Sequence, residues 1–338
     1  MRIKTILIIL AILASLAAAD AGEFGVKDVG RGLATSAEYL DAGSVFMNPA
    51  SAGMIRASCF SGAYGRLAWG IGGSNIERSI ASYVFRRKYL GGVGVSFGIL
   101  NQDVSYNARL GLTVAPEFRL FHKEVSLGIT GTWYQTGYRR SEFEGHDMGP
   151  DPLFDSGTQK NAFGVSAGLL ANIYDRLWLG LAARDINEPN LALQDTITFG
   201  KRPMELQAGL QYPVHRYFQP GVDYFWRNET INEEQLSRVR VGIESHLPRG
   251  FLLRAGYDGT GIDAGLTIHS SALFGGFDLD YAFVYPLEED LAEVGAVSHH
   301  FGVSIWGISK SPPTVDLVAE NLAPNGRIIP GVRGEIVG

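Results

Sequence analysis

Two adjacent histidines and a short acidic cluster are the side chains of this sequence whose types could support chemistry. His299 and His300 lie in a segment that alternates like a β-strand, so their side chains point to opposite faces and cannot bind one metal ion together. The acidic residues between Pro286 and Glu293 are typical of a solvated loop, with a weak divalent-cation site as the alternative. We therefore predict no metal site.

Charged side chains also recur at alternate positions of several apolar segments, which places them on one face of each expected strand. Such a face could form a selectivity surface, hold a plug, or simply pair charges between neighbouring strands, and we favour pairing. The residues concerned are Arg109, Arg184, Glu205, Asp223, Arg238, Arg240, Glu244, Arg254, Asp263, Asp278 and Asp280.

Zinc-protease and nucleotide-binding motifs are absent. The sequence has no His-Glu-x-x-His and no Walker-type loop, and we predict no catalytic residue, no cofactor and no enzymatic activity. A hydrolase with scattered Ser, His and Asn remains the alternative. The single cysteine, Cys59, excludes an internal disulfide and a Cys-based zinc cluster. The net charge of −6 and the pI of 5.7 provide no basic surface for nucleic acid.

Strands are the elements that must position these charges. Between residues 56 and 308 apolar and polar residues alternate, as in the segment where Leu206 and Leu210 share one face and Gln207 lies on the other. We expect an all-β fold of about fourteen antiparallel strands. They lie near residues 58–65, 78–86, 91–101, 107–115, 124–136, 162–172, 177–184, 204–212, 218–226, 238–244, 251–257, 262–269, 277–285 and 298–307.

Long and short links alternate between these strands, which is typical of outer-membrane barrels with short periplasmic turns and long extracellular loops. The short links lie near 87–90, 174–176, 213–217 and 247–250, and the long ones near 137–161, 185–202, 227–236 and 286–297. The link at 258–261 is short on the expected outer side. A soluble β-sandwich is the alternative, with the apolar face buried instead of facing lipid.

Both ends of the chain differ from the middle. The N-terminus predicts a cleaved signal peptide at 1–19, and hence export to the outer membrane. The signs are Arg2 and Lys4, the apolar run from Ile6 to Leu16, and the small residues after it. We expect a plug segment at 20–55, a single transmembrane barrel at 56–308 and a periplasmic tail at 309–338, where prolines recur and alternation ends.

The motif Asn48, Pro49 and Ala50 stands just before the first expected strand. The residue before a proline is pushed out of the α region, so any preceding short helix ends here and the chain turns. An Asn-Pro-Ala motif at this place resembles the FadL-like fatty-acid transporters and the PorV/PorQ-like proteins of type IX secretion. The resemblance implies a fourteen-stranded barrel whose N-terminal plug includes these three residues.

That resemblance also implies the function that we expect. The main hypothesis is a plugged barrel that handles or transports a small hydrophobic or amphipathic molecule, with outer-membrane lipid around it. The alternatives are a PorV/PorQ-like component of a type IX apparatus, which would bind secretion-system proteins, and a structural surface protein. At 338 residues the chain has little room for large extracellular insertions that capture a ligand.

Overall fold

The computed structural model describes residues 24–69, 75–121, 123–139, 157–174, 176–193, 200–228, 235–271, 276–293 and 295–307. The predicted signal peptide and C-terminal tail lie outside the described residues, as does most of the long link at 137–161.

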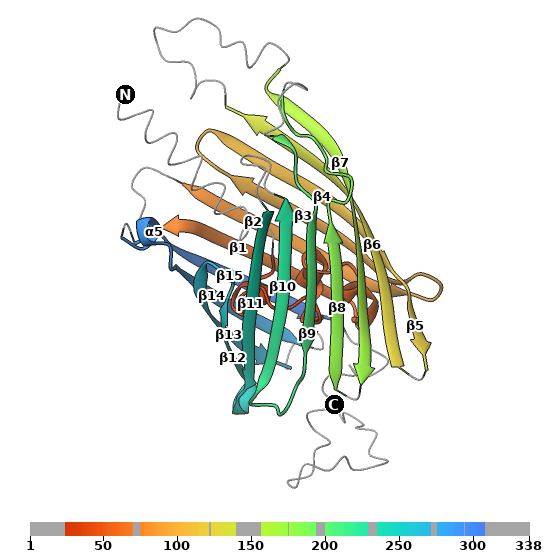
Figure 1. The fold of residues 1–338 in the computed structure, drawn as a ribbon. Coiled ribbons are helices and arrows are strands. Elements are labelled where there is room, and N and C mark those ends of the chain that lie inside the picture. Colours follow the sequence, from red (N-terminus) through yellow and green to blue (C-terminus); the bar gives the residue numbers. More distant parts are fainter. Residues whose placement is uncertain are drawn as a thin grey trace, which may run out of the picture.

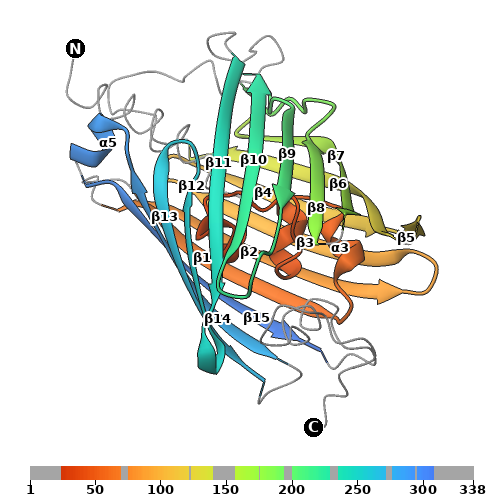
Figure 2. The ribbon, with the colours of Figure 1, turned by 60° about the horizontal axis from the view of Figure 1, so that its bottom comes forward.

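One antiparallel sheet forms the wall of the molecule and closes on itself through the pairing of β4 with β6. Figures 1 and 2 show the closed barrel. The strands are β1 (Cys59–Trp69), β2 (Ile76–Arg87), β3 (Gly91–Asn101), β4 (Ser105–Ala115), β5 (Glu117–Leu120), β6 (Lys123–Tyr138), β7 (Gln159–Tyr174), β8 (Leu177–Arg184), β9 (Glu205–Gln211), β10 (Gln219–Asn228), β11 (Gln235–His246), β12 (Phe251–Tyr257), β13 (Gly261–Ser270), β14 (Phe277–Pro286) and β15 (Val297–Trp306).

Pro116 explains why fifteen segments make a wall of fourteen strands. Strands β4 and β5 follow one another along the same partner, β6, and are interrupted only at this proline, which has no N–H to donate. The prediction of a single antiparallel barrel of about fourteen strands is confirmed. The short extension β5 was not predicted from the sequence.

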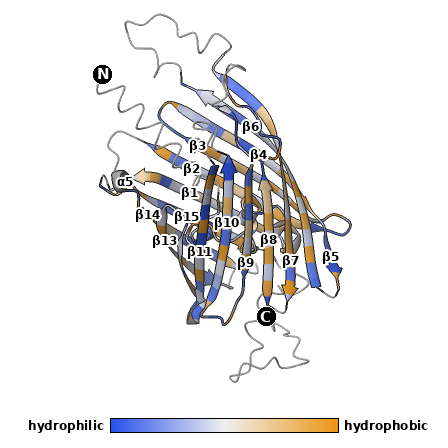
Figure 3. Cartoon of the chain, viewed as in Figure 1, coloured by the Kyte–Doolittle hydropathy of each residue, from blue (hydrophilic) through white to orange (hydrophobic). Residues whose placement is uncertain are grey.

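Side chains alternate across the wall as the sequence indicates. On β9, Leu206 and Leu210 are exposed on the outer face, whereas Gln207 between them is only 3% exposed and points inward. Figure 3 shows the same mixture of apolar and polar residues along the strands. Among the described helices, none is both long and apolar enough to cross a bilayer. The apolar outer face is what a lipid-facing barrel requires.

Residues 24–57, which we call the N-terminal segment, lie inside the barrel and contain α2 (Val26–Val29), the 3-10 helix η1 (Ala42–Phe46) and α3 (Ser51–Met54). Asp41 caps η1 by accepting a 2.6 Å hydrogen bond from the Gly43 amide, and Ser44 completes a capping box. Apolar residues of the segment, such as Val45 and Phe46, pack against apolar residues of the wall, such as Val84.

Two links contain short helices. The 3-10 turn η4 (Pro248–Gly250) joins β11 to β12, and α5 (Glu289–Glu293) lies between β14 and β15. For the acidic cluster around α5 the sequence predicts a loop. A single helical turn forms because the Glu288 carbonyl accepts from Leu291 and Ala292, and no glycine or proline interrupts these residues.

Candidate functional site

The motif Asn48, Pro49 and Ala50 lies against the inner face of β6 and β7. Asn48 is fully buried, and its Nδ2 donates to the Ser36 carbonyl at 2.8 Å and to the Leu169 carbonyl of β7 at 3.1 Å. Its Oδ1 accepts from the Ala50 amide at 3.0 Å. One side chain thus joins two parts of the N-terminal segment to the wall. The motif predicted from the sequence therefore has a definite structural role in this position.

Inward-facing glycines line the wall where the backbone of the N-terminal segment approaches it. A Cβ on Gly128 would collide with the backbone of Pro49 and Ala50, and one on Gly168 would collide with the Asn48 amide group. The same holds for Gly92 against Ala52, Gly180 against Ser36, and Gly242 and Gly256 against Arg31. Glycine is required here because the backbone of the segment, or at Gly168 the Asn48 side chain, lies directly against the wall, and not because of an unusual φ.

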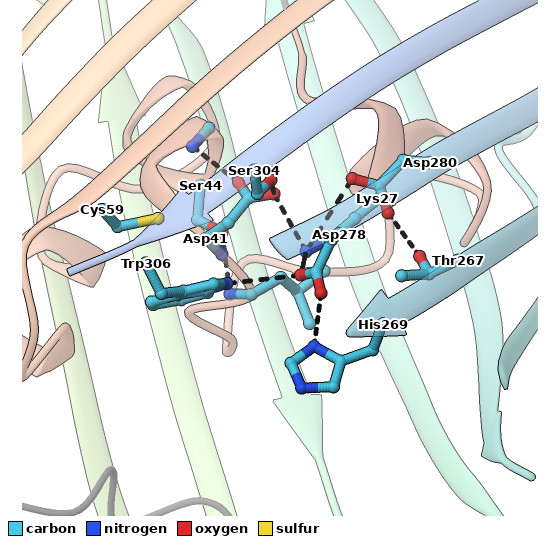
Figure 4. A network of polar contacts seen from close by, with 12 residues as sticks. Lys27, Asp41, Ser44, Cys59, Thr267, His269, Asp278, Asp280, Ser304 and Trp306 are labelled. Atoms are coloured by element: carbon cyan, nitrogen blue, oxygen red, sulfur yellow. Dashed lines mark hydrogen bonds and ion pairs between the residues drawn. The ribbon is translucent and has the colours of Figure 1, made fainter. Parts of the chain in front are cut away.

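Lys27 holds the opposite side of the segment through three carboxylates (Figure 4). Its Nζ lies 2.5 Å from Asp278 and 3.9 Å from Asp280 of β14, and 3.3 Å from Asp41 of the segment itself. All four side chains are at least nine-tenths buried. Burial alone would lower the pKa of Lys27, but the three carboxylates outweigh it and hold the pKa above its ordinary value. Lys27 is therefore charged.

The wall and the segment share further contacts around this ion cluster. Ser304 of β15 donates to Asp41 at 2.8 Å, and Trp306 Nε1 lies 3.3 Å from Asp278. His269 Nδ1 is 2.6 Å from the other Asp278 oxygen. Each acid of the cluster is therefore bonded by more than one partner, as a buried carboxylate requires.

A second buried pair lies within the segment. Arg31 is fully buried, its Nη1 is 2.5 Å from Glu38, and its Nη2 donates to the Gln219 carbonyl of β10. Close by, Asp28 accepts from Thr35 Oγ1 at 2.7 Å. Burial, together with the neighbouring Asp41 carboxylate, raises the pKa of Asp28 to about 7.

The wall charges predicted from the sequence lie on the inner face. Some pair between neighbouring strands, as Arg254 does with Glu244 at 2.5 Å and Arg184 with Glu205 at 2.8 Å. Others contact the segment: Arg184 also donates to the Met47 carbonyl at 3.0 Å. The remaining predicted residues on this face are Arg109, Asp223, Arg238, Arg240, Asp263, Asp278 and Asp280.

Aromatic rings accompany several of these arginines. The Arg240 guanidinium lies 4.0 Å from the ring centroid of Phe225, and Arg109 lies 4.8 Å from that of Phe46 in the N-terminal segment. A small cavity of about 20 Å³, enough for one water molecule, lies beside Arg109 and Tyr134. Its other lining residues include Ile80, Leu191 and Arg202.

The two adjacent histidines face opposite ways, as predicted. His300 is fully buried on the inner face, with Nδ1 3.0 Å from Arg78 Nη2, and His299 lies on the outer face with Nδ1 2.8 Å from the Tyr281 hydroxyl. In the described part of the chain no three His, Cys, Asp or Glu side chains come together in a way that could hold a metal ion.

Four charged residues of the N-terminal segment were not predicted from the sequence as site residues: Lys27, Arg31, Glu38 and Asp41. The available signal was the presence of ionisable residues in a stretch that is otherwise small and apolar. Because this stretch lacks strand alternation, nothing in the pattern indicated which way these side chains point.

Comparison with known proteins gives the family. The model of the family described as type IX secretion system membrane protein PorP/SprF matches residues 33–304. The chain belongs to the PorP/SprF family. The match covers the strands and most of the N-terminal segment of this PorP/SprF protein. A search of curated proteins found no match.

Solved structures share the fold of this PorP/SprF barrel at low sequence identity. A Pseudomonas aeruginosa FadL homologue is 12% identical, with a TM-score of 0.53 over 83% of this chain and 97% of the other. The Ralstonia pickettii toluene transporter TbuX is also 12% identical, with a TM-score of 0.52 over 83% and 96%. The Pseudomonas putida toluene transporter TodX is 10% identical, with a TM-score of 0.52 over 84% and 96%. The predicted resemblance to FadL-like and Por-like outer-membrane barrels is confirmed.

Proposed function

We propose that this protein is a closed component of a type IX secretion apparatus in the outer membrane, and that the N-terminal segment acts as a permanent plug. Family membership supports the apparatus, and the contacts of the segment support closure. The observation that carries closure is the burial of Lys27 among Asp41, Asp278 and Asp280.

Moving the segment out of the lumen would be costly. It would separate Lys27 from two wall carboxylates and leave these acids without their cation inside the barrel. Breaking a buried ion pair by removing one partner costs about 3–5 kcal/mol. The glycine-lined contacts at Gly128 and Gly168 would be lost in the same movement. A plug held in this way stays in place during function, so the barrel serves as a platform for other proteins.

Export through the predicted signal peptide is part of this proposal, and cell fractionation tests it. We expect the protein in the outer membrane, starting near Asp20, with a gel mobility that changes on boiling because folded barrels resist detergent. A soluble periplasmic protein with no mobility change would contradict it.

Two measurements test the closed platform. In planar bilayers the purified protein should conduct no ions, whereas a variant with a displaced plug, such as Gly168→Val, should conduct. In cells, secretion-system proteins should co-purify with the barrel, and deletion of the gene should stop secretion of type IX substrates. A conducting wild-type protein would contradict closure, and normal secretion without the gene would contradict the apparatus role.

The second candidate function is passage of a small apolar or amphipathic molecule through the barrel. The specific observation is the fold shared with proteins described as toluene transporters. Liposomes that contain the protein should then take up toluene faster than protein-free liposomes. Under the closed-platform proposal the two rates are equal.

A further inference from the structure

One part of the rim is built differently from the rest of the wall. Strand β4 ends at Ala115, where it pairs with Gly92 near the start of β3, but β5 continues for four residues along β6 alone. At about 3.3 Å per residue, residues 116–120 reach about 17 Å beyond the end of β4. Figure 1 shows β5 at the lower rim beside the first residues of β6. Within the described residues no strand pairs with its other side.

This side of β5, which we call the β5 edge, offers backbone groups to a partner. The Leu127 amide of β6 donates to the Pro116 carbonyl at 3.2 Å. In an antiparallel ladder hydrogen-bonding residues alternate, so the N–H and C=O groups of Glu117 and Arg119 point away from β6. An exposed edge of this kind is a template for the addition of another strand.

Apolar side chains surround the β5 edge. Tyr89 in the β2–β3 turn and Phe121 in the β5–β6 turn are 88% and 87% exposed, and Leu90, Phe118 and Leu120 are also exposed. The aromatic belts of membrane barrels lie at the bilayer surface. Phe121 instead lies in the turn that ends the extension formed by β5 and the first residues of β6, beyond the end of β4. This exposure fits a protein contact better than a lipid contact.

The same rim is positively charged in a chain whose net charge is −6. Residues 86–90 and 117–124 together with Arg56 contain six Lys and Arg residues and two acids, an excess of four positive charges. Both acids are already bonded: Glu117 contacts Arg56 and Arg86, and Glu124 is 3.0 Å from Arg56. Arg87, Lys88 and Arg119 remain exposed at the surface.

From these observations we infer that the β5 edge is a docking site for an extended, acidic segment of a periplasmic protein, which adds as a strand beside Glu117–Leu120. The inference deepens the proposed function, on which it rests, because it names the surface and the chemistry by which an apparatus protein binds. The backbone edge provides the pairing, and Arg119 and Lys88 select acidic side chains.

The docking site is also connected to the plug. Arg56 ends the N-terminal segment and contacts Glu117 of β5, and Arg86 Nη1 donates to the Gly53 carbonyl of α3 at 3.0 Å. A strand bound at the β5 edge would therefore stabilise the same charges that fix α3 in the lumen.

Photo-cross-linking in cells tests the docking site. A photoreactive phenylalanine analogue replaces Phe121, and its cross-linked products are identified by mass spectrometry. The cross-linking at Phe121 is repeated in a variant that also carries Arg119→Pro. This proline removes an N–H that points away from β6, so the barrel ladder stays intact. Arg119→Ala removes only the charge. The same analogue at Tyr106, at the other end of the β4–β6 hairpin, is the matched control.

We expect Phe121 to cross-link to an apparatus protein through an acidic segment, and Tyr106 not to. Arg119→Pro should reduce the product about tenfold and Arg119→Ala about threefold, while the heat-dependent gel mobility of both variants stays normal. Equal cross-linking in Arg119→Pro and wild type, or products with phospholipid alone, would overturn the inference. If apparatus proteins co-purify but Phe121 does not cross-link to them, only the docking site fails. If none co-purifies, the proposed function fails.

Discussion

The two sides of the N-terminal segment are held to the wall in opposite ways. On the β14–β15 side, Lys27 binds through charge, with three carboxylates around one ammonium group. On the β6–β7 side, Asn48 and Pro49 bind through shape and neutral hydrogen bonds, with the wall reduced to glycine at Gly128 and Gly168.

The two kinds of contact are therefore disturbed by different kinds of substitution. A buried charge cluster depends on its balance, so the loss of one member leaves the others without compensation. A glycine-lined contact depends on space, so the addition of one methyl group is enough to disturb it. The charged side should therefore be the more sensitive to deletion, and the glycine side to enlargement.

The largest effect is expected for Lys27→Met. The change leaves Asp41, Asp278 and Asp280 buried together without a cation and should reduce the free energy of unfolding by about 3–5 kcal/mol. Urea unfolding in detergent micelles at pH 7 measures it.

Two controls belong with this measurement. Lys123→Met, at the start of β6 beside the β5 edge, should change stability by less than about 1 kcal/mol. Adding Asp278→Asn to Lys27→Met should recover part of the loss, since one uncompensated charge is removed. If Lys27→Met unfolds at the wild-type urea concentration, the charge cluster does not hold the segment.

The variant Asn48→Ala tests the hydrogen bonds that hold the segment on the β6–β7 side. The variant loses the hydrogen bonds to the Ser36 and Leu169 carbonyls and leaves both buried acceptors without this donor, which should cost about 2–3 kcal/mol. The same unfolding assay applies, with Asn107→Ala as control because the Asn107 side chain accepts from Thr136 of the neighbouring strand and not from the N-terminal segment. A smaller loss for Asn48→Ala than for Asn107→Ala would reverse the expected order.

The wall could be predicted from the sequence, whereas most contacts of the N-terminal segment could not. Alternation around Leu206 and Gln207 determines which face meets lipid, because a one-residue slip would exchange the two faces. Extension β5 has only four residues after Pro116, too few to show alternation. Lys27 and Asp278 lie 251 positions apart, and no periodic pattern connects them. Asn48 was found because the Asn-Pro-Ala motif resembles that of a known family and because the proline that follows it marks a turn.

Enlargement is tested by Gly128→Ala, which should cost about 1–3 kcal/mol because the new methyl group meets the backbone of Pro49 and Ala50. Gly131→Ala is the matched control on the same strand. There the methyl group would meet only the ring of Phe163 on the lipid-facing side, which can rotate away. Measurable ion conductance for Gly128→Ala but not for Gly131→Ala would link the loss of fit to opening of the lumen. Equal stability of the two variants would contradict the role of shape on this side.

The smallest effect concerns Asp28 of α2, whose pKa is raised from 3.8 to about 7 mainly by burial. Because the folded state holds this proton more tightly than the unfolded chain, its stabilising contribution is complete below pH 4 and is lost as the pH rises through 7. Asp28→Asn should remove this dependence.

The variant and wild type should therefore be equally stable near pH 4, and the variant more stable by about 1 kcal/mol at pH 8. This is less than the ~4 kcal/mol that the two pKa values alone would allow, since local opening lets Asp28 ionise in water. Urea unfolding at both pH values measures the difference, with Asp103→Asn in the exposed β3–β4 turn as control. A wild type that gains stability over Asp28→Asn as the pH rises would mean that Asp28 is ionised in the folded protein and belongs with Asp41 as a partner of Lys27, which would add a fourth carboxylate to the charged side of the segment.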